Sequence, residues 1–222
     1  MTPSRGKTRK KSAIHSSGTI SGSREQALQL SLPPPFAPLG EEDRTPPLRV
    51  LTIGHSNLSA EKVITLLRQY GITTMIDVRS EPYSRYAPHF CRAPFAASLG
   101  AASIAYRWMG DTLGGRPADP ACYYDNIVRK GNVDFQALSV HPHFQSGLRD
   151  LIAQAHSGQV AIMCSEEDPR RCHRHRLIES SLREHGVEVL HIRRDGSCEV
   201  IEEKDIKNEV ATHPQLMLAG FP

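Results

Sequence analysis

Residues 160–169 read VAIMCSEEDP, and this stretch decides the fold. Its first five residues are apolar, and a short apolar run of this kind is typical of a strand that is buried on both faces. After the polar residues that follow, Asp168 is a suitable N-cap and Pro169 a suitable first residue of a helix. The helix is expected to run to His185, because Gly186 follows as a stop signal. A buried strand followed directly by a helix predicts an α/β fold with a parallel sheet.

The same alternation extends in both directions along the chain. Strands are expected at residues 48–53, 72–78, 104–108 and 187–192, and helices at residues 59–70, 94–99 and 144–155. Residues 110–142 are expected to form a long loop with room for one helical turn, and the chain after Arg193 a small hairpin and a final helix. The predicted fold class is α/β: a single domain with a mostly parallel five-stranded sheet flanked by helices, in a Rossmann-like three-layer arrangement.

The N-terminal segment differs in composition from this domain. Residues 1–47 are rich in Ser, Pro, Lys and Arg, so we expect a disordered basic tail that buries too little apolar surface to fold. Residues 48–205 are expected to form the α/β domain and residues 206–222 a C-terminal extension. Three interpretations of the tail stay open: a solvated leader, a basic arm that contacts nucleic acid, and an organellar transit peptide.

Charge and cysteine content limit the possible classes of protein. Residues 1–30 hold six Lys and Arg against one Glu, so the rest of the chain is slightly acidic although the total formal charge is +3. Attraction to nucleic acid would therefore come mainly from the tail. The five cysteines are odd in number and irregularly spaced, which indicates a reducing compartment rather than a disulfide scaffold. With no apolar stretch long enough to span a membrane, we expect a cytoplasmic protein with no membrane partner.

Polar and reactive side chains follow each of four predicted strands. Because ligands bind outside the carboxyl ends of strands in open α/β sheets, these side chains are expected to share one edge of the sheet. The candidates are His55 and Ser56 after the first strand, Asp77, Arg79 and Arg85 around the second, Gly114 and Gly115 after the third, and Cys164, Glu166, Cys172, His173 and Arg174 after the fourth. They would converge on one pocket only if the first, second and fourth strands are neighbours, and that pocket should measure a few hundred Å³, as small-ligand sites do.

These residue types suggest roles in acid–base and nucleophilic chemistry. Arg79, Arg85 and Arg174 are suited to hold an anion, together with Ser56, Gly114 and Gly115. His55 or His173 would carry a proton, Asp77 would orient that imidazole, and Glu166 is a second candidate base. Cys172, expected in the first turn of a helix, would be a nucleophile or a redox-sensitive bystander, and Cys164 is a further candidate. Each residue also has an ordinary structural interpretation: core cysteines, loop-capping polar groups and surface ion pairs.

Two tempting motifs carry less weight. Cys164 and Arg170 have the Cys-x5-Arg spacing of cysteine phosphatases, but the acidic residues between them would repel a phosphate and raise the pKa of the thiol. Cys164, Cys172 and His173 resemble metal ligands, and His55 would complete a set of four. Because their spacing is not that of a zinc ribbon, we predict no metal site from the sequence.

Taken together, these motifs suggest a family. Gly54-His55-Ser56-Asn57, Asp77-Val78-Arg79, Leu113-Gly114-Gly115 and the Cys164…Pro169…Cys172-His173-Arg174 element resemble, in this order, the domain-of-unknown-function 488 (DUF488) family over residues 49–200. The resemblance implies a cytoplasmic α/β domain of the kind found in prokaryotes, and it implies no particular activity. Arg170 is not part of the family pattern, which further weakens the phosphatase interpretation.

The leading functional hypothesis is an enzyme, a hydrolase or transferase, that acts on a phosphorylated or otherwise anionic small molecule or on a nucleotide. The alternative is a non-catalytic module that binds a nucleotide or, with help from the tail, nucleic acid. The sequence leaves the cofactor and the oligomeric state open.

Overall fold

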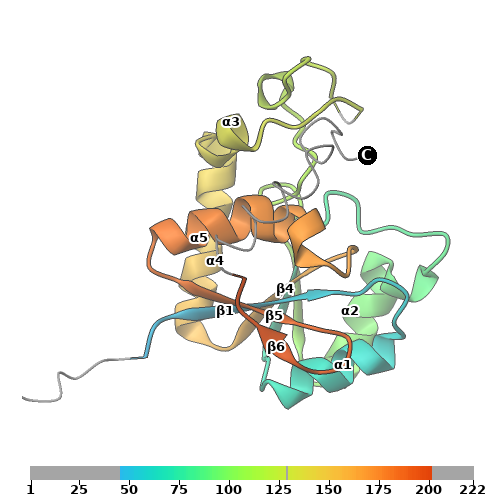
Figure 1. Cartoon of the computed structure of the whole chain (residues 1–222). Coiled ribbons are helices and arrows are strands. Elements are labelled where there is room, and N and C mark those ends of the chain that lie inside the picture. The colour runs from blue at the N-terminus through green and yellow to red at the C-terminus, as the bar shows by residue number, and fades with distance from the viewer. Residues whose placement is uncertain (1–45, 129, 202–222) are drawn as a thin grey trace, which may run out of the picture. The chain divides into compact units, whose positions relative to one another are not determined.

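A computed structural model describes residues 46–128 and 130–201 (Figure 1). The predicted final helix and the C-terminal extension lie outside the described residues, and so does all of the predicted tail except residues 46 and 47. Of the helices that the structure describes, none is long and apolar enough to cross a membrane.

The described residues build an α/β fold around one sheet of six strands. The strands are β1 (Arg49–Gly54), β2 (Thr74–Asp77), β3 (Ala105–Trp108), β4 (Val160–Cys164), β5 (Glu188–Ile192) and β6 (Cys198–Glu199). Their order in the sheet is β3-β2-β4-β1-β5-β6, and the first five are parallel. The predicted parallel five-stranded sheet is therefore confirmed. The sixth strand pairs antiparallel with β5 and forms the small hairpin expected after Arg193.

Helices cover both faces of the sheet (Figure 1). The longer helices are α1 (Ala60–Gln69), α2 (Arg92–Ala101) and α4 (Pro142–Ser157), and the shorter ones are α3 (Phe135–Ser139) and α5 (Ser180–Glu184). One core cluster joins α1 and α2 to the sheet, and a second joins α4 and α5 to its other face. Burial of apolar side chains in both layers explains why β4 is apolar along its whole length.

Local signals define the start of α1 as expected. The Ser59 side chain accepts a hydrogen bond from the backbone N–H of Lys62, which is the contact of an N-cap. The helix buries Val63, Leu66 and Leu67, which recur at helical spacing. Gly71 then follows with a φ of 64°, so the helix stops where the sequence predicts.

The segment after β4 differs from the prediction of one continuous helix. Asp168 caps only a 3₁₀ turn, Pro169–Arg171, by accepting a hydrogen bond from the N–H of Arg170. Cys172 is extended, with φ −126° and ψ 149°, and the chain then enters a π-helix, Arg174–Glu179, that leads into α5. The prediction that Cys172 lies in the first turn of a helix is therefore wrong. The extended residue lets the chain turn back, so that the Cys172 thiol reaches the end of β4.

The connection between β3 and α4 also holds more structure than expected. It contains a 3₁₀ turn, Pro120–Cys122, in addition to α3, and a further 3₁₀ turn, Pro88–Phe90, precedes α2. The Pro120–Cys122 turn begins at the N-cap Asp119, and α3 begins at the N-cap Asp134. Each aspartate side chain accepts hydrogen bonds from backbone N–H groups.

Candidate functional site

The sheet changes its direction of winding between β1 and β4. These strands are neighbours, but α1 follows β1 on one face and the helical segment after β4 lies on the other. Such a switch point leaves a crevice at the carboxyl ends of the two strands, where α/β proteins bind ligands. The first, second and fourth strands are consecutive in the sheet, with β4 in the middle, which is the arrangement that a single site requires.

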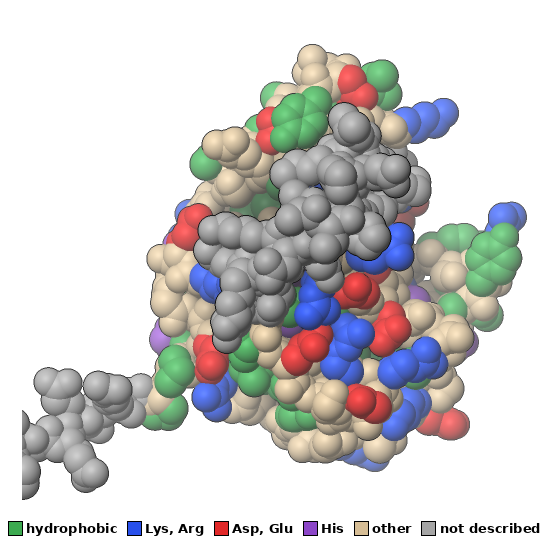
Figure 2. Space-filling model, viewed as in Figure 1, with side chains coloured by type: hydrophobic (Ala, Val, Ile, Leu, Met, Phe, Trp, Pro, Cys, Tyr) green, Lys and Arg blue, Asp and Glu red, His purple; other side chains and the backbone are tan. Residues whose placement is uncertain are grey.

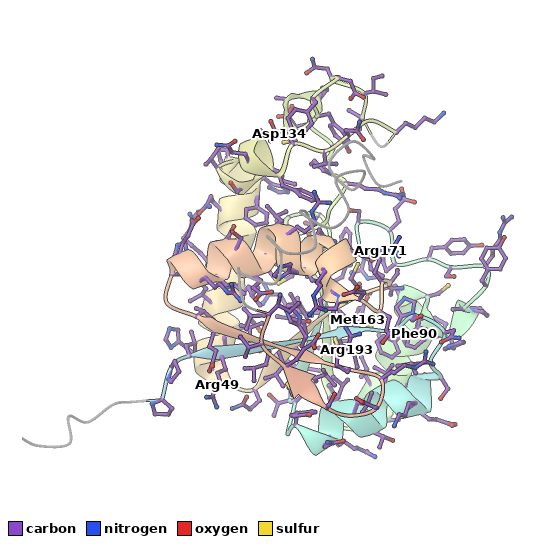
Figure 3. All side chains as sticks on the ribbon, in the orientation of Figure 1. Arg49, Phe90, Asp134, Met163, Arg171 and Arg193 are labelled. Carbon is purple, nitrogen blue, oxygen red and sulfur yellow. The ribbon has the colours of Figure 1, made fainter. Side chains whose placement is uncertain are left out.

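The loops after β1 and β4 are in close contact at this point. The N–H groups of His55 and Ser56 donate to the carbonyl oxygens of Cys164 and Ser165, at 3.0 and 2.8 Å. A Cβ atom on Gly54 would lie 1.8 Å from the carbonyl oxygen of Glu166, so only glycine permits this approach. Gly54 thus brings Glu166 to the edge of the sheet. Met163, Phe90 and Arg171 are labelled at this end of the molecule in Figure 3.

Four side chains meet at the end of β4, and we call them the cysteine cluster: Cys164, Glu166, Cys172 and His173. The Glu166 carboxylate oxygen Oε2 accepts from the Sγ atoms of Cys164 and Cys172 at 3.0 and 3.4 Å. His173 Nδ1 lies 3.7 Å from each sulfur. Its other ring nitrogen, Nε2, donates to the carbonyl oxygen of Val78 at 3.2 Å, which fixes the orientation of the ring. Both thiols are buried, whereas Glu166 and His173 are partly exposed.

Arg174 holds Cys172 from behind the cluster. Its backbone N–H and its Nε–H both donate to Cys172 Sγ, at 3.5 and 3.4 Å. Its terminal nitrogens donate to Thr52 Oγ1 at 3.0 Å and to the carbonyl oxygen of Glu166 at 2.6 Å. Arg174 is 1% exposed, so it acts here as an internal clamp on the site.

The two thiols differ in their pKa values. Burial by itself raises the pKa of Cys172, but the hydrogen bond from Cys164 and the charges of Arg174 and His173 lower it well below its usual value. The pKa of Cys164 is raised well above its usual value, because its proton is shared with Cys172 and its surroundings are buried. Burial opposes charge on His173, yet Cys172 raises the pKa of this imidazole. The two shifts have opposite directions, so Cys172 is the thiol of the cluster that loses its proton more readily.

Asp77 and Arg79 form a second group next to the cluster, at the end of β2. The Arg79 Nε and NH2 groups donate to the two oxygens of Asp77 at 2.9 and 2.6 Å, and Tyr106 donates to Asp77 Oδ2 at 2.8 Å. Arg79 also donates to the Phe90 carbonyl oxygen at 2.7 Å. Asp77 thus orients Arg79, and not an imidazole as expected.

The contacts of His55 are those of a neutral imidazole whose Nε2 accepts a hydrogen bond. Its Nδ1 donates to the carbonyl oxygen of Ser56 at 3.0 Å, which leaves Nε2 to accept from Arg79 NH1 at 3.3 Å. Its ring stacks on Phe90 with the centroids 4.2 Å apart. Burial and the nearby charge of Arg79 lower the pKa of His55 to about 4. His55 is therefore uncharged at neutral pH and serves to position Arg79.

The remaining candidates lie at the rim of the site or beyond it. A Cβ on Gly115 would be 2.8 Å from the His173 ring, and one on Gly114 2.4 Å from Ser80 Oγ, so this loop packs directly on the cluster. Ser56 joins the rim through its backbone and has a φ of 42°. Arg85 is exposed and packs on the Tyr86 ring, 4.8 Å from its centroid, in a connection that projects from the sheet (Figure 1).

A comparison with protein-family models identifies the chain. The model described as "Domain of unknown function DUF488" matches residues 59–181, which is more than half of the sequence. The chain belongs to the DUF488 family. No curated protein and no solved structure gives a match. The match contains every candidate from Asp77 to Arg174, whereas β1 with Gly54 and His55 lies outside it.

This DUF488 protein also contains a largely buried polar network, in part outside the matched residues, that the sequence analysis missed. Glu179 Oε2 accepts from His175 Nδ1 at 2.6 Å and from His191 Nε2 at 2.8 Å, and its other oxygen accepts from Arg183 at 2.6 Å. His191 Nδ1 lies 2.7 Å from Thr52 Oγ1, which also contacts Arg174. The one signal in the sequence was a histidine among the apolar residues at the end of strand β5, where Val189 and Ile192 are buried.

The charges around the cysteine cluster of this DUF488 protein are largely paired. Arg193 lies 3.4 Å from Glu167 and 3.5 Å from Glu199, and Arg170 lies 3.6 Å from Asp168. Figure 2 shows basic and acidic side chains interspersed on this face. A cavity of about 570 Å³ lies at the amino ends of β1 and β5, lined by residues such as Pro47 and Val187. It includes none of the candidate residues, and a pocket that joins them stays a prediction.

Proposed function

We propose that this DUF488 protein is an enzyme and that the cysteine cluster is its reaction centre. One observation carries the proposal: two sulfurs, an imidazole and a carboxylate lie within 3.7 Å of their neighbours at the switch point of the sheet. Strongly perturbed titratable groups concentrate at catalytic sites, because catalysis needs proton affinities that differ from those in water. The reaction class that fits is hydrolysis or group transfer.

The cysteine cluster is expected to lower the stability of the fold, and this supports a functional interpretation. A thiolate at the buried Cys172 would lose hydration, and the Glu166 carboxylate beside it would repel it. An apolar pair of similar size would pack the end of β4 without these costs. Arg174 and His173 offset the negative charge, but Arg174 adds a further buried charge. A site of this composition is expected where its chemistry is used.

Glu166 is the best-placed group for proton transfer. Its side chain is partly exposed, and Oε2 is within hydrogen-bond reach of both sulfurs, so it can pass a proton between the cluster and a substrate. The Cys172 thiolate can act as a nucleophile or can bind a metal ion. Three further potential metal ligands, Cys164, Glu166 and His173, lie next to it, and this composition favours the second use.

A small anionic substrate is the class that we propose. Arg116 is exposed and follows Gly115, the residue that packs on His173, so we expect its guanidinium to be available to a ligand near the cluster. The N–H of Arg116 donates to Ser80 Oγ at 3.0 Å, which anchors this loop to the end of β2. Arginine binds phosphate and carboxylate groups in a bidentate manner.

The test is a turnover assay with the full chain. Phosphate monoesters, phosphodiesters and nucleotides are incubated with the wild type, Cys172→Ser and Glu166→Gln, and Cys198→Ser is the matched control because Cys198 lies on β6, outside the cluster. We expect repeated turnover by the wild type and the control, and a loss of about 10²–10⁴-fold for Glu166→Gln, the range of general acid–base catalysis. Stoichiometric binding at the cluster without turnover would show the alternative, a non-catalytic binding module.

A further inference from the structure

The cysteine cluster has the composition of a metal-binding site. Cys164 Sγ, Cys172 Sγ and His173 Nδ1 all lie within 4.8 Å of one another, and Glu166 Oε2 lies 3.0 and 3.4 Å from the two sulfurs. Two sulfurs and an imidazole nitrogen are donors that suit zinc and related transition metals, whereas magnesium and calcium prefer oxygen. From these four donors we infer that the cluster binds one zinc-like divalent ion, with Cys164, Cys172 and His173 as ligands and Glu166 at the fourth position.

The distances between the donors agree with this inference. Zinc binds sulfur at about 2.3 Å and nitrogen at about 2.0–2.1 Å, so a tetrahedral site separates its sulfur and nitrogen ligands by about 3.6 Å. The distance from each sulfur to His173 Nδ1 is 3.7 Å. Both sulfur–nitrogen pairs thus already have the spacing that a common ion would impose, although Cys164 and Cys172 come from separate segments of the chain.

The outer contacts also match those of metal ligands. A ligating histidine usually donates its second ring N–H to a carbonyl or carboxylate, which turns the free nitrogen toward the ion. His173 does this through Nε2 and the Val78 carbonyl oxygen, and Gly115 packs against its ring. The two N–H groups that Arg174 directs at Cys172 Sγ would stabilise a metal-bound thiolate in the same way.

Ion binding has a defined proton balance. The protons that the Cys164 and Cys172 sulfurs and His173 Nδ1 carry leave to solvent as the sulfur and nitrogen lone pairs bind the ion. The two thiolate charges balance the charge of the ion, and Arg174 balances Glu166.

This inference deepens the proposed function by assigning the cluster a metal, but it stands on the donor geometry alone. With three protein ligands and an exchangeable fourth position, the site would have the arrangement of catalytic rather than closed structural zinc sites. A water molecule that replaced Glu166 at the ion would lie beside its carboxylate, which could accept the proton. The partial exposure of Glu166 gives the fourth position contact with solvent.

The experiment uses the full chain, freed of metal by a chelator under reducing conditions and titrated with Co²⁺. Cobalt bound to thiolates has an intense charge-transfer absorption in the near ultraviolet, which reports sulfur ligation directly. We expect this absorption to saturate at about one ion per chain and to be lost in Cys172→Ser and strongly reduced in Cys164→Ser and His173→Ala. The control Cys198→Ser should behave as the wild type, and Zn²⁺ should displace the cobalt.

Folding of each metal-free variant is checked by circular dichroism, so that loss of binding is not confused with loss of structure. Reduced, folded wild type without the absorption, or equal absorption in Cys172→Ser and Cys198→Ser, would overturn the inference. The two proposals fail separately. Metal binding without turnover of any substrate would leave the metal site and remove the enzyme, whereas turnover by a folded wild type that shows no cobalt absorption would do the reverse.

Discussion

Replacement of Gly54 by alanine tests whether β1 and the loop after β4 are as close as described. The new Cβ would lie 1.8 Å from the carbonyl oxygen of Glu166, 2.6 Å from its carbonyl carbon and 2.8 Å from the Cα of Glu167. All three atoms belong to the backbone, and carbon atoms in contact are normally 3.5–4.0 Å apart, so the loop must move by about 1.5 Å. Overpacking of this kind costs about 1–3 kcal/mol, and we expect the upper end because no side chain can rotate away.

The displacement should also disturb the cysteine cluster. Arg174 donates to the same Glu166 carbonyl oxygen at 2.6 Å, and the Glu166 carboxylate contacts both thiols. We expect weaker cobalt binding as well as a fall in the unfolding midpoint of about 5–10 °C for a domain of this size. Fluorescence of Trp108, the only tryptophan of the chain, follows unfolding.

Gly100→Ala is the matched control. Gly100 lies in α2 with nothing within 4 Å of the new Cβ, so alanine should stabilise the helix by up to about 1 kcal/mol. A Gly54→Ala protein with the stability of the wild type and unchanged cobalt binding would refute the close approach of β1 to the Glu166 carbonyl group.

Three further predictions follow from individual contacts. Burial alone would raise the pKa of Glu179, but its hydrogen bonds with His175 and His191 lower it to about 2 from an ordinary 4.5. Because the pKa of Glu179 is lower in the folded state, this group stabilises the fold above about pH 4.5, and the stabilisation, about 3 kcal/mol in all, is lost as the pH falls toward about 2. In urea unfolding across this pH range, the free energy of unfolding should therefore fall less for Glu179→Gln than for the wild type. Tyr106→Phe removes the hydrogen bond to the buried Asp77 carboxylate and should cost about 2 kcal/mol in urea unfolding, and an unchanged midpoint would contradict that contact. Ser59→Ala removes the N-cap of α1 and should cost about 1 kcal/mol by the same measurement, whereas a Lys62→Ala control keeps the backbone N–H that the cap binds.

The fold could be predicted because its central strands contain short apolar runs with clear ends. Val160–Cys164 has the predicted bounds, and the other parallel strands differ from the predictions by a few residues. Burial between two helical layers makes such runs visible in the sequence. The helix after β4 could not be predicted in the same way, because Asp168 and Pro169 signal a helix start whether the turn continues or stops after three residues.

The sequence predicted which residues form the candidate site better than it predicted which of their side chains are in contact. Parallel strands end at one edge, so the co-location of Cys164, Glu166, Cys172 and His173 followed from their positions after a single strand. The order of the strands is a separate fact, because sequence patterns do not specify which strands are neighbours. The hydrogen-bond partners of side chains were the hardest to predict. Arg79 was expected to bind a ligand, but its side chain donates to Asp77, two residues away.

The π-helix explains how the cluster and the buried network are joined. In an α-helix, residues five apart are rotated by about 140° around the axis, so Arg174 and Glu179 would point to different sides. The i→i+5 hydrogen bonding of a π-helix brings such residues back to one side, and π turns are frequent at functional sites. Arg174 reaches Thr52 on β1, and Glu179 reaches His191 on β5, and these two strand residues are paired across the sheet.

The chain of contacts from Cys172 through Arg174, Thr52 and His191 to Glu179 therefore depends on this local geometry. These contacts connect the Cys172 sulfur to the buried carboxylate of Glu179, whose position is fixed by hydrogen bonds from His175 and Arg183. The links are buried, so a change at Glu179 should shift His191 first and Arg174 through Thr52 after it. A helix that only packed on the sheet would not need a π-helical segment. The less favourable hydrogen-bond geometry of this segment is explained if the protein must control the position of the Cys172 sulfur.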